Sequence, residues 1–273
     1  MSRLKLSNSF LYRTGERIIP GAVAETVLSE HYSRYIFSTE FCQGKKVLNV
    51  ASGCGYGSEV LLRTAAEVYN IDIDEELIAY GNNRYGSYKN HFFQMDAQDM
   101  KLPDRLFDTI VSFETFEHLP DHKRFIMECR RVLKDNGTIV LSMPNKVISS
   151  PGLEKPSNKF HFKEWEYDEL IAELKDAFDV GGVYGQNFMT PTTTPSAGVR
   201  KILWDVIFFW YDIIPAVLLK YLKKYYLGYK EVPAREVKVE ETHRIKQAKK
   251  ESFYLDNTGR AYAIIILVLS KKQ

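Results

Sequence analysis

Residues 47–57 form the stretch that most constrains the fold, because they read VLNVASGCGYG. Apolar residues typical of a buried strand lead into a turn with Gly53, Gly55 and Gly57, and a helix is expected to start at Ser58. In such a unit, backbone N–H groups at the helix start point toward an anionic or polar ligand. Glycine lets that ligand approach closely and tolerates positive φ. Because one glycine-rich turn is a weak signal, an ordinary tight turn stays open at this stage.

Residues at the ends of the next two expected strands favour a nucleoside site. Asp72 follows an expected strand over 67–71, about 20 residues beyond the glycine loop, where an acid can accept hydrogen bonds from both ribose hydroxyls. Asp96 and Ala97 follow another expected strand over 91–95. The carboxyl ends of parallel strands meet at one edge of a sheet, and ligands bind there. The spacing therefore predicts a nucleoside across the tips of the first three strands.

Strand and helix patterns alternate along the chain, which predicts a mostly parallel sheet with helices on both faces. The expected strands are 46–50, 67–71, 91–95, 107–113, 137–142, 180–186 and 261–269, and the expected helices are 21–41, 58–65, 75–86, 121–133 and 167–176. Asp135, Asn136 and Gly137 indicate a turn before the fifth strand. The apolar run at 261–269 predicts a last strand that is buried on both faces.

These motifs resemble the class I S-adenosylmethionine (SAM) dependent methyltransferases, in their seven-stranded Rossmann-like form, over about residues 46–141 and again at the C-terminus. The resemblance implies an α/β fold whose antiparallel last strand lies beside the fifth, with a helical insertion between strands six and seven. It implies SAM as the cofactor. The residues that it assigns to SAM binding are Asn49, Ala51, Ser52, Gly53, Gly55, Asp72, Ile73, Asp96, Ala97, Phe113 and Glu114.

Two residues depart from that family pattern. The first strand carries Asn49 where the family has Asp or Glu, and Ala51 replaces the first loop glycine. Asn49 can hydrogen-bond but supplies no negative charge for the amino group of the donor, and Ala51 adds a methyl where the backbone should lie close to it. Weaker SAM binding is expected, and a SAM-binding relic without turnover stays open. A nicotinamide-dependent oxidoreductase would share Asp72, but it would not explain Asp96 and Ala97.

Methyl transfer to a hydroxyl requires removal of a proton, and His118 lies just past the fourth expected strand. Histidine titrates near neutral pH and suits general-base work. The run Glu114, His118 and Asp121 resembles sugar O-methyltransferases, in which this histidine is the expected base, and Glu117 orients it or acts itself. A role for His118 that only shapes the pocket stays open. No metal site is predicted, although ubiquinone-type O-methyltransferases share the EHL run and leave a weak Mg²⁺ role for Glu117 open.

Two further segments bear on the acceptor. Residues 12–20, YRTGERIIP, resemble an arm of methyltransferases encoded among glycan-assembly enzymes, and residues 158–164, NKFHFKE, resemble a stretch of enzymes that methylate sugars or lipid-linked glycans. The resemblance implies that Tyr12, Arg13 and Thr14 help to cover the donor or acceptor, and that His161 reaches the mouth of the site. A solvated arm and a packed histidine are the plain alternatives. A quinone-like or nitrogen acceptor and a non-catalytic membrane-associated protein also stay open.

The expected organisation has an N-terminal arm and helix covering the cofactor site over 1–45, a SAM-binding core over 46–186 and 254–273, and a helical insertion over 187–253. The insertion contains an aromatic-rich apolar run over 202–219. A helical cap on the core or on a partner subunit is favoured, followed by a segment in a membrane interface. Asp205 and Asp212 argue against a membrane span.

Composition narrows the possible functions and the cellular location of the protein. The 273 residues have a formal net charge of +2, which argues against a dedicated nucleic-acid binder. Cys42, Cys54 and Cys129 have no paired spacing and are expected to be reduced thiols, and the N-terminus lacks the apolar core of a signal peptide. We therefore expect a cytoplasmic protein with a small-molecule or glycan acceptor and no nucleic-acid partner. Peripheral membrane contact through 201–230 and a homodimer stay open.

Overall fold

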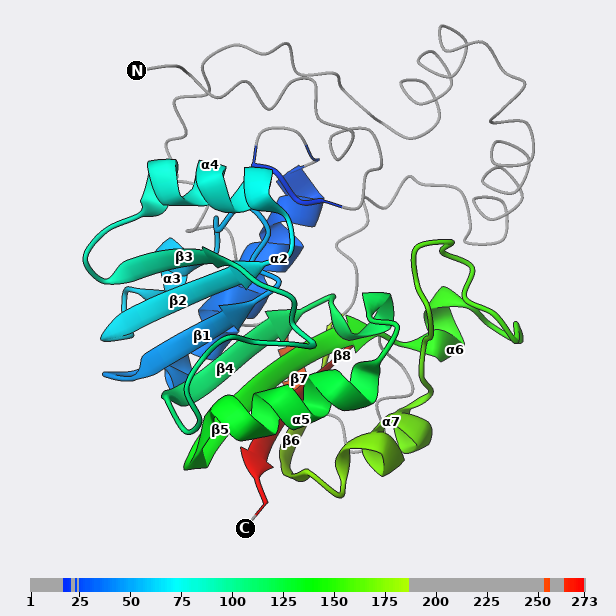
Figure 1. Ribbon diagram of the computed structural model, residues 1–273. Coiled ribbons are helices and arrows are strands. Elements are labelled where there is room, and N and C mark those ends of the chain that lie inside the picture. The colour runs from blue at the N-terminus through cyan, green and yellow to red at the C-terminus, as the bar shows by residue number, and fades with distance from the viewer. Residues whose placement is uncertain (1–16, 21–22, 24, 187–252, 256–262, 273) are drawn as a thin grey trace, which may run out of the picture.

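The structure is a computed structural model that describes residues 17–20, 23, 25–186, 253–255 and 263–272 (Figure 1). Its strands are β1 Lys46–Val50, β2 Glu67–Asp72, β3 Asn90–Gln94, β4 Phe107–Phe113, β5 Leu133–Pro144, β6 Phe178–Gln186, β7 Phe253–Leu255 and β8 Ile264–Lys271. Its α-helices are α2 Glu25–Ser38, α3 Ser58–Leu61, α4 Glu75–Tyr85, α5 His122–Val132, α6 Lys146–Ser149 and α7 Tyr167–Leu174, and its 3₁₀ helices are η2 Thr39–Phe41 and η3 Phe116–His118.

The strands form one mixed sheet in the order β3-β2-β1-β4-β5-β8-β6-β7. Strands β1 to β5 pair in parallel, whereas β8 is antiparallel to both β5 and β6. The Rossmann-like fold with an antiparallel last strand beside the fifth is therefore confirmed. The short strand β7, which pairs with the end of β6, was not predicted and brings the described strands in the sheet to eight.

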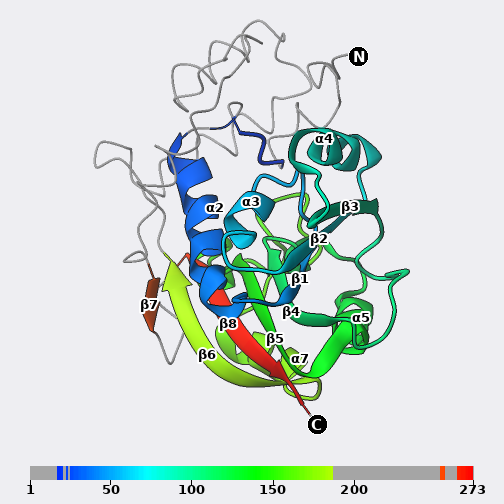
Figure 2. The same cartoon turned by 90° about the vertical axis from the view of Figure 1, so that its left-hand side faces the viewer.

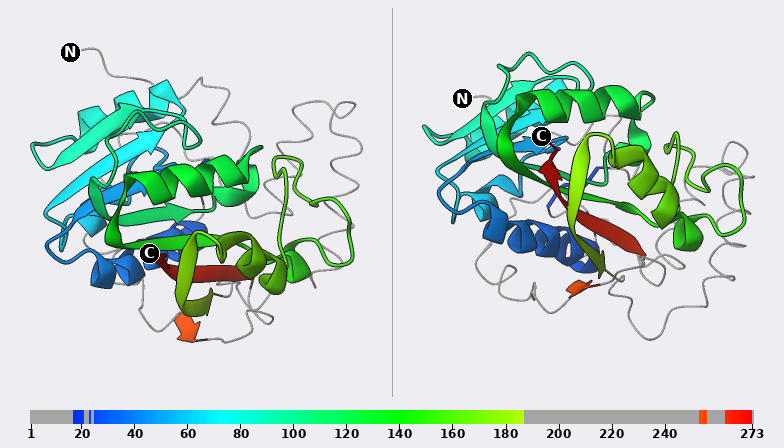
Figure 3. Two further views of the ribbon diagram at one scale, coloured as in Figure 1. Left: turned by 60° about the horizontal axis from the view of Figure 1, so that its bottom comes forward. Right: turned by 90° about the horizontal axis from the view of Figure 1, so that it is seen from below.

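Helices cover both faces of the sheet, as the alternating pattern predicts. Helices α2, α3 and α4 pack on one face, and α5 and α7 pack on the other (Figures 2 and 3). Strand β8 contributes to both cores, because Ile265 belongs to one cluster and Ile266 to the other, and both are 0% exposed. Burial on both faces explains why this strand reads as a continuous apolar run.

Two predicted boundaries, the end of α3 and the start of β5, differ most from the structure. The helix expected over 58–65 ends at Leu61, and the Thr64 hydroxyl donates to the carbonyl oxygens of Thr39 and Leu61. Such local side-chain bonds compete with helix continuation. The turn expected before the fifth strand lies inside β5. Leu133 pairs with Phe107 and Thr138 pairs with Thr109, so the extra residues of β5 shift its register against β4 between these two pairs.

Several predictions fall outside the described residues. Residues 1–16, which include Tyr12, Arg13 and Thr14, and residues 187–252, which include the apolar run at 202–219, are among them. Within the described part of the chain, no helix has the length and apolarity needed to cross a bilayer. The three cysteines are buried and unpaired, in agreement with the prediction of reduced thiols.

Candidate functional site

Asp72 lies at the carboxyl end of β2, directly beside the glycine loop. The backbone N–H of Gly53 donates to Oδ2 of Asp72 at 2.8 Å, and the N–H of Asp74 donates to Oδ1 at 3.0 Å. The Arg17 guanidinium lies 3.4 Å from the same Oδ1. Asp72 is only 2% exposed, and these contacts hold its carboxylate at the junction of β1 and β2. The acid and the loop therefore meet, as the sequence spacing predicts.

Three left-handed residues shape the loop: Ala51 has φ 53°, Gly53 has φ 56° and Gly55 has φ 78°. Gly53 borders open space, since a Cβ there would meet nothing within 4 Å. At Gly55, by contrast, a Cβ would lie 2.3 Å from the Phe92 ring. Gly53 therefore leaves room beside Asp72, whereas Gly55 is needed for packing. Ala51 adopts the left-handed conformation in spite of its methyl group, at a cost of about 1 kcal/mol.

The asparagine that replaces the family acid is part of a buried amide network. Nδ2 of Asn49 donates to Oδ1 of Asn70 at 2.9 Å, and Nδ2 of Asn70 donates to Oδ1 of Asn90 at 2.8 Å. Asn49 is 1% exposed, so its amide hydrogen-bonds to a neighbouring strand inside the protein. Ser52 is equally buried, and its Oγ has no hydrogen-bond partner among the described residues, which leaves a polar atom for a ligand.

Ile73 and Asp96 extend this site along the tips of β2 and β3. Ile73 is an apolar side chain that is 61% exposed although its neighbour Asp72 is buried. Asp96 caps its own loop, accepting from the N–H of Gln98 at 2.8 Å and from Nε2 of Gln98 at 3.2 Å. Ala97 is buried in the core below. An apolar surface between the buried Asp72 and the half-buried Asp96 suits a base and its ribose.

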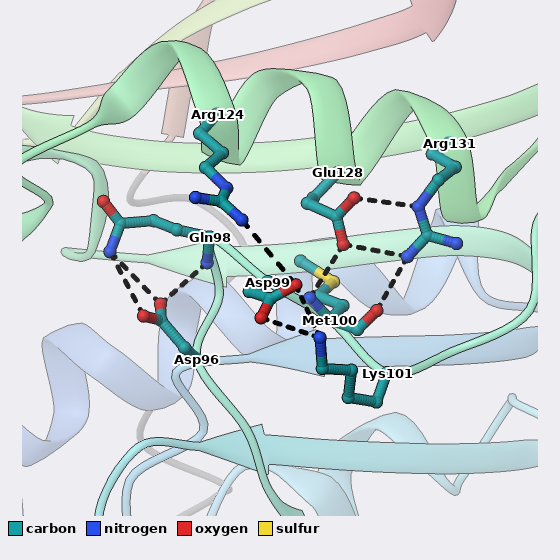
Figure 4. Close-up of polar contacts among 8 residues, drawn as sticks. All are labelled: Asp96, Gln98, Asp99, Met100, Lys101, Arg124, Glu128 and Arg131. Atoms are coloured by element: carbon teal, nitrogen blue, oxygen red, sulfur yellow. Dashed lines mark hydrogen bonds and ion pairs between the residues drawn. The ribbon is translucent and has the colours of Figure 1, made fainter.

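Helix α5 fixes the loop that carries Asp96 (Figure 4). Oε2 of Glu128 accepts from the N–H of Met100 at 2.7 Å, and Arg131 donates to the carbonyl oxygen of Met100 at 2.7 Å. Arg131 also pairs with Glu128 at 2.8 Å. This clamp was missed by the sequence reasoning, because its partners lie on separate elements.

The end of β4 is strained. Glu114 has φ 50° without being glycine, and its Oε1 accepts a hydrogen bond from the Ser142 hydroxyl at 2.8 Å. Phe113, just before it, is 8% exposed. Left-handed non-glycine residues persist where the surrounding structure imposes them, and they cluster at functional sites.

Glu117 is a buried carboxyl group at this same edge. It is 1% exposed, and neither of its oxygens has a hydrogen-bond partner among the described residues. Burial raises its pKa well above the ordinary value, and the negative charges of Glu114 and Glu164 raise it further. A carboxyl group in this setting is energetically costly unless a ligand compensates it.

Two histidines from distant parts of the sequence meet beside Glu117. The His118 and His161 rings are 4.7 Å apart in an edge-on arrangement, and Nε2 of His118 is 3.9 Å from Oε1 of Glu117. Nδ1 of His118 lies 3.1 Å from the carbonyl oxygen of Phe160, and Nδ1 of His161 lies 2.6 Å from Oε1 of Glu164. Sequence reasoning named His118 and Glu117 as a pair and His161 in a separate segment, and the structure brings the three together.

Glu164 was missed as a site residue, although its spacing of three from His161 in the 158–164 run was a usable signal. It is 3% exposed and accepts from the Ser149 hydroxyl at 2.5 Å. Burial alone would raise its pKa, but hydrogen bonds from His161, Ser149 and Ser150 lower it below the ordinary value. Glu164 is therefore a carboxylate that orients the His161 ring.

The sheet order and the polar groups at the ends of β1 to β4 define a nucleoside-binding α/β protein of the methyltransferase type. A family model described as a methyltransferase domain matches residues 48–141. A Mycolicibacterium smegmatis protein, named as a probable S-adenosylmethionine-dependent methyltransferase, is 35% identical over 179 residues, which are 65% of this chain and 69% of the relative. The chain therefore belongs to the SAM-dependent methyltransferases, and SAM is the cofactor of that family.

Two other comparisons bear on this result. Rv3030 of Mycobacterium tuberculosis, also named as a probable SAM-dependent methyltransferase, is 36% identical over 172 residues, 63% of this chain. The match spans 62% of the length of that relative. The ubiquinone biosynthesis O-methyltransferase of Coxiella burnetii is 31% identical over 116 residues, 41% of this chain and 49% of that enzyme.

A solved structure shows the same fold at low sequence identity. The methyltransferase in complex with the Trm112 methyltransferase activator of Haloferax volcanii has a TM-score of 0.58 and 15% identity. The match covers 90% of this chain and 92% of that one. This likeness supports the sheet order and the helix layers, and it carries no information on the acceptor.

Proposed function

We propose that this protein transfers a methyl group from SAM to a hydroxyl group of a sugar or lipid-linked glycan. One observation supports an oxygen acceptor above all: His118 and the buried Glu117 lie together just past the end of β4, at the edge that carries the nucleoside site. The acceptor class rests on the resemblance of residues 12–20 and 158–164 to glycan-modifying enzymes.

The residues at the tips of β1 to β3 fit the cofactor. Asp72 would accept hydrogen bonds from the ribose hydroxyls, and Ile73 would pack on the adenine, whose edge Asp96 and Ala97 would face. Gly53 offers open space, and the Oγ of Ser52 is a buried polar atom that no described residue hydrogen-bonds. SAM supplies an electrophilic methyl group on a sulfonium and therefore needs orientation more than activation.

We assign activation of the acceptor hydroxyl to His118 with Glu117. The contact of Nδ1 with the Phe160 carbonyl favours the tautomer that carries its hydrogen on Nδ1. The basic lone pair of that tautomer is on Nε2, the atom that faces Glu117. Nε2 would take the proton of the acceptor hydroxyl, and Glu117 would stabilise the resulting imidazolium.

A quinone-like phenolic acceptor is the second candidate. It is favoured by the matching ubiquinone biosynthesis O-methyltransferase, whose name specifies transfer to oxygen. A glycan hydroxyl and a phenol differ in acidity, so a phenolic acceptor would depend less on a base.

The test is an assay of methyl transfer from labelled SAM to a panel of sugars, glycan-linked lipids and hydroquinones. The proposal expects turnover of a glycan hydroxyl, with kcat about 10²–10⁴-fold lower in His118→Gln and the KM for SAM unchanged. The acidic limb of the pH–rate profile should disappear in that variant. Turnover restricted to phenols would select the second candidate, and an unchanged kcat in His118→Gln would remove His118 as the base.

A further inference from the structure

Glu117, His118 and His161 share a geometry that base catalysis alone does not require. One ligand atom from each residue lies within 4.8 Å of the other two. Two separate segments supply them: η3 carries Glu117 and His118, and the loop between α6 and α7 carries His161. The N–H of Phe162 donates to the carbonyl oxygen of Glu117 at 2.7 Å, which ties the two segments together at this point.

Both imidazoles are oriented through Nδ1. The carbonyl oxygen of Phe160 lies 3.1 Å from Nδ1 of His118, and the Glu164 carboxylate lies 2.6 Å from Nδ1 of His161. Metal-binding histidines typically donate one ring N–H to a carbonyl or carboxylate, which fixes the other nitrogen as the ligand. This pattern leaves Nε2 as the ligand atom in each ring.

The third group is a carboxyl group that needs a partner. Glu117 is 1% exposed, and both of its oxygens lack a hydrogen-bond partner among the described residues. A buried polar group without a partner destabilises the folded chain, and a cation between the three side chains would compensate that cost.

We propose that Glu117, His118 and His161 bind one divalent transition-metal ion, with Glu164 as a positioning residue for His161. Two imidazoles and one carboxylate suit ions such as Zn²⁺, Co²⁺ or Fe²⁺, whereas Mg²⁺ prefers oxygen ligands. Binding requires a local change at His161, because Nδ2 of Asn158 now lies 3.0 Å from its Nε2. The Asn158 side chain must rotate away for His161 to coordinate the ion.

This inference deepens the proposed function and rests on it in one respect, the role of the ion in turnover. Three protein ligands leave a coordination position open, as in catalytic metal sites. An acceptor hydroxyl bound there would become more acidic. Because the ion would occupy Nε2 of His118, the proton would then pass to solvent water, and the role of His118 as the base applies to the protein without the ion. The binding of the ion itself does not depend on any acceptor.

The experiment titrates chelator-treated full-length protein with Co²⁺ and records the visible d–d absorption, with metal content measured after dialysis. We expect one ion per chain and no displacement by a thousandfold excess of Mg²⁺. Affinity should fall at least tenfold in Glu117→Gln, His118→Gln and His161→Gln, and about 10–100-fold in Glu164→Gln, which does not touch the ion. Circular dichroism of each metal-free variant confirms that it is folded.

A matched control is His122→Gln, because His122 also pairs with a carboxylate, at 3.1 Å from Glu173, but belongs to no three-ligand group found among the described residues. Its Co²⁺ affinity should equal that of the wild type. Absence of a stoichiometric ion in the wild type, or wild-type affinity in Glu117→Gln and His161→Gln, would overturn the proposal. SAM binding is measured in the same samples: SAM binding without Co²⁺ binding refutes the metal site alone, and the converse refutes the proposed function alone.

Discussion

Three asparagine side chains on the neighbouring strands β1, β2 and β3 form a chain of hydrogen bonds. The first of them, Asn49, stands where the family pattern has an acid. Asn49 donates to Asn70, Asn70 donates to Asn90, and Nδ2 of Asn90 donates to the Ser58 hydroxyl at 2.8 Å. The first two links join amide to amide, so that Asn70 and Asn90 each act as both donor and acceptor. The departure at residue 49 is therefore explained by its neighbours, because a carboxylate there would face the carbonyl oxygen of Asn70.

We predict that Asn49→Asp lowers the free energy of unfolding by about 1–3 kcal/mol at pH 7, since it removes the donor to Asn70 and buries a charge. Urea denaturation measures the change. The exposed Asn83→Asp on α4 is the matched control and should lie within about 0.5 kcal/mol of the wild type. Equal losses in the two variants would show that the amide network is not the cause.

Glu117 gives a pH-dependent prediction for metal-free protein. Burial raises its pKa above the ordinary 4.5, so below pH 4.5 the group is protonated in both the folded and the unfolded chain. As the pH rises above that value, the unfolded chain releases a proton that the folded chain retains, and the wild type loses stability. Glu117→Gln escapes this loss and should be more stable by roughly 1–3 kcal/mol at pH 7.

Urea denaturation from pH 4 to 7 in the presence of a chelator checks the effect of Glu117→Gln. The stability difference between variant and wild type should grow as the pH rises. A difference that is constant over this range, or that favours the wild type, would show that the carboxyl group is compensated in the metal-free protein.

At the scale of elements, two glycines of the same loop have different roles: Gly55 is needed for packing, and Gly53 leaves space for a ligand. Gly53 and Gly55 have similar left-handed backbones, but only Gly55 lies against a side chain, the Phe92 ring. The loop, η3 and the segment after α6 all converge on one edge of the sheet. The sequence predicts the first two from local patterns, whereas the third reaches this edge only through the tertiary fold.

Alanine at the two loop glycines should therefore have different effects. Gly53→Ala should cost about 1–2 kcal/mol of stability, from positive φ alone, and should weaken SAM binding. Gly55→Ala adds a clash with Phe92 and should cost roughly 2–5 kcal/mol. Thermal unfolding and calorimetric SAM titration of both variants provide the comparison. A Gly53→Ala variant that is less stable than Gly55→Ala would contradict this account of the loop.

For the whole molecule, β8 holds the two cores together. It lies between β5 and β6, pairs antiparallel with both, and has buried side chains facing each helix layer. Strand β8 follows the other described strands in the sequence, yet its neighbours in the sheet, β5 and β6, lie about 80 or more residues before it. Non-local pairing of this kind links the end of the chain to the stability of the whole domain.

Truncation of β8 on either face should destabilise the protein similarly. Ile265→Ala and Ile266→Ala each remove a fully buried side chain from a different core and should cost about 2–5 kcal/mol. Ser270→Ala, at an exposed position of the same strand, should change stability by less than about 0.5 kcal/mol. A large loss for only one isoleucine would mean that the two helix layers unfold separately.

The sequence predicted what local patterns determine. The strand ends that precede or carry Asp72 and Asp96 followed from hydrophobic runs, whereas the place of the last strand followed from the resemblance to the methyltransferase family. The pairing of His118 with the 158–164 segment did not, because 42 residues separate His118 from Phe160 and no local periodicity links them. The β5 register shift and the α5 clamp likewise depend on contacts between distant elements.

Calorimetric titration of the full chain with SAM tests the central claim most directly, that a nucleoside binds beside Asp72. The account predicts one SAM per chain in the wild type and at least about tenfold weaker binding in Asp72→Asn, because a charged acceptor of ribose hydroxyls is lost. Asp108→Asn, which changes an acid near the opposite end of β4, should bind SAM as the wild type does. Absence of SAM binding, or equal affinity in Asp72→Asn and the wild type, would contradict the account.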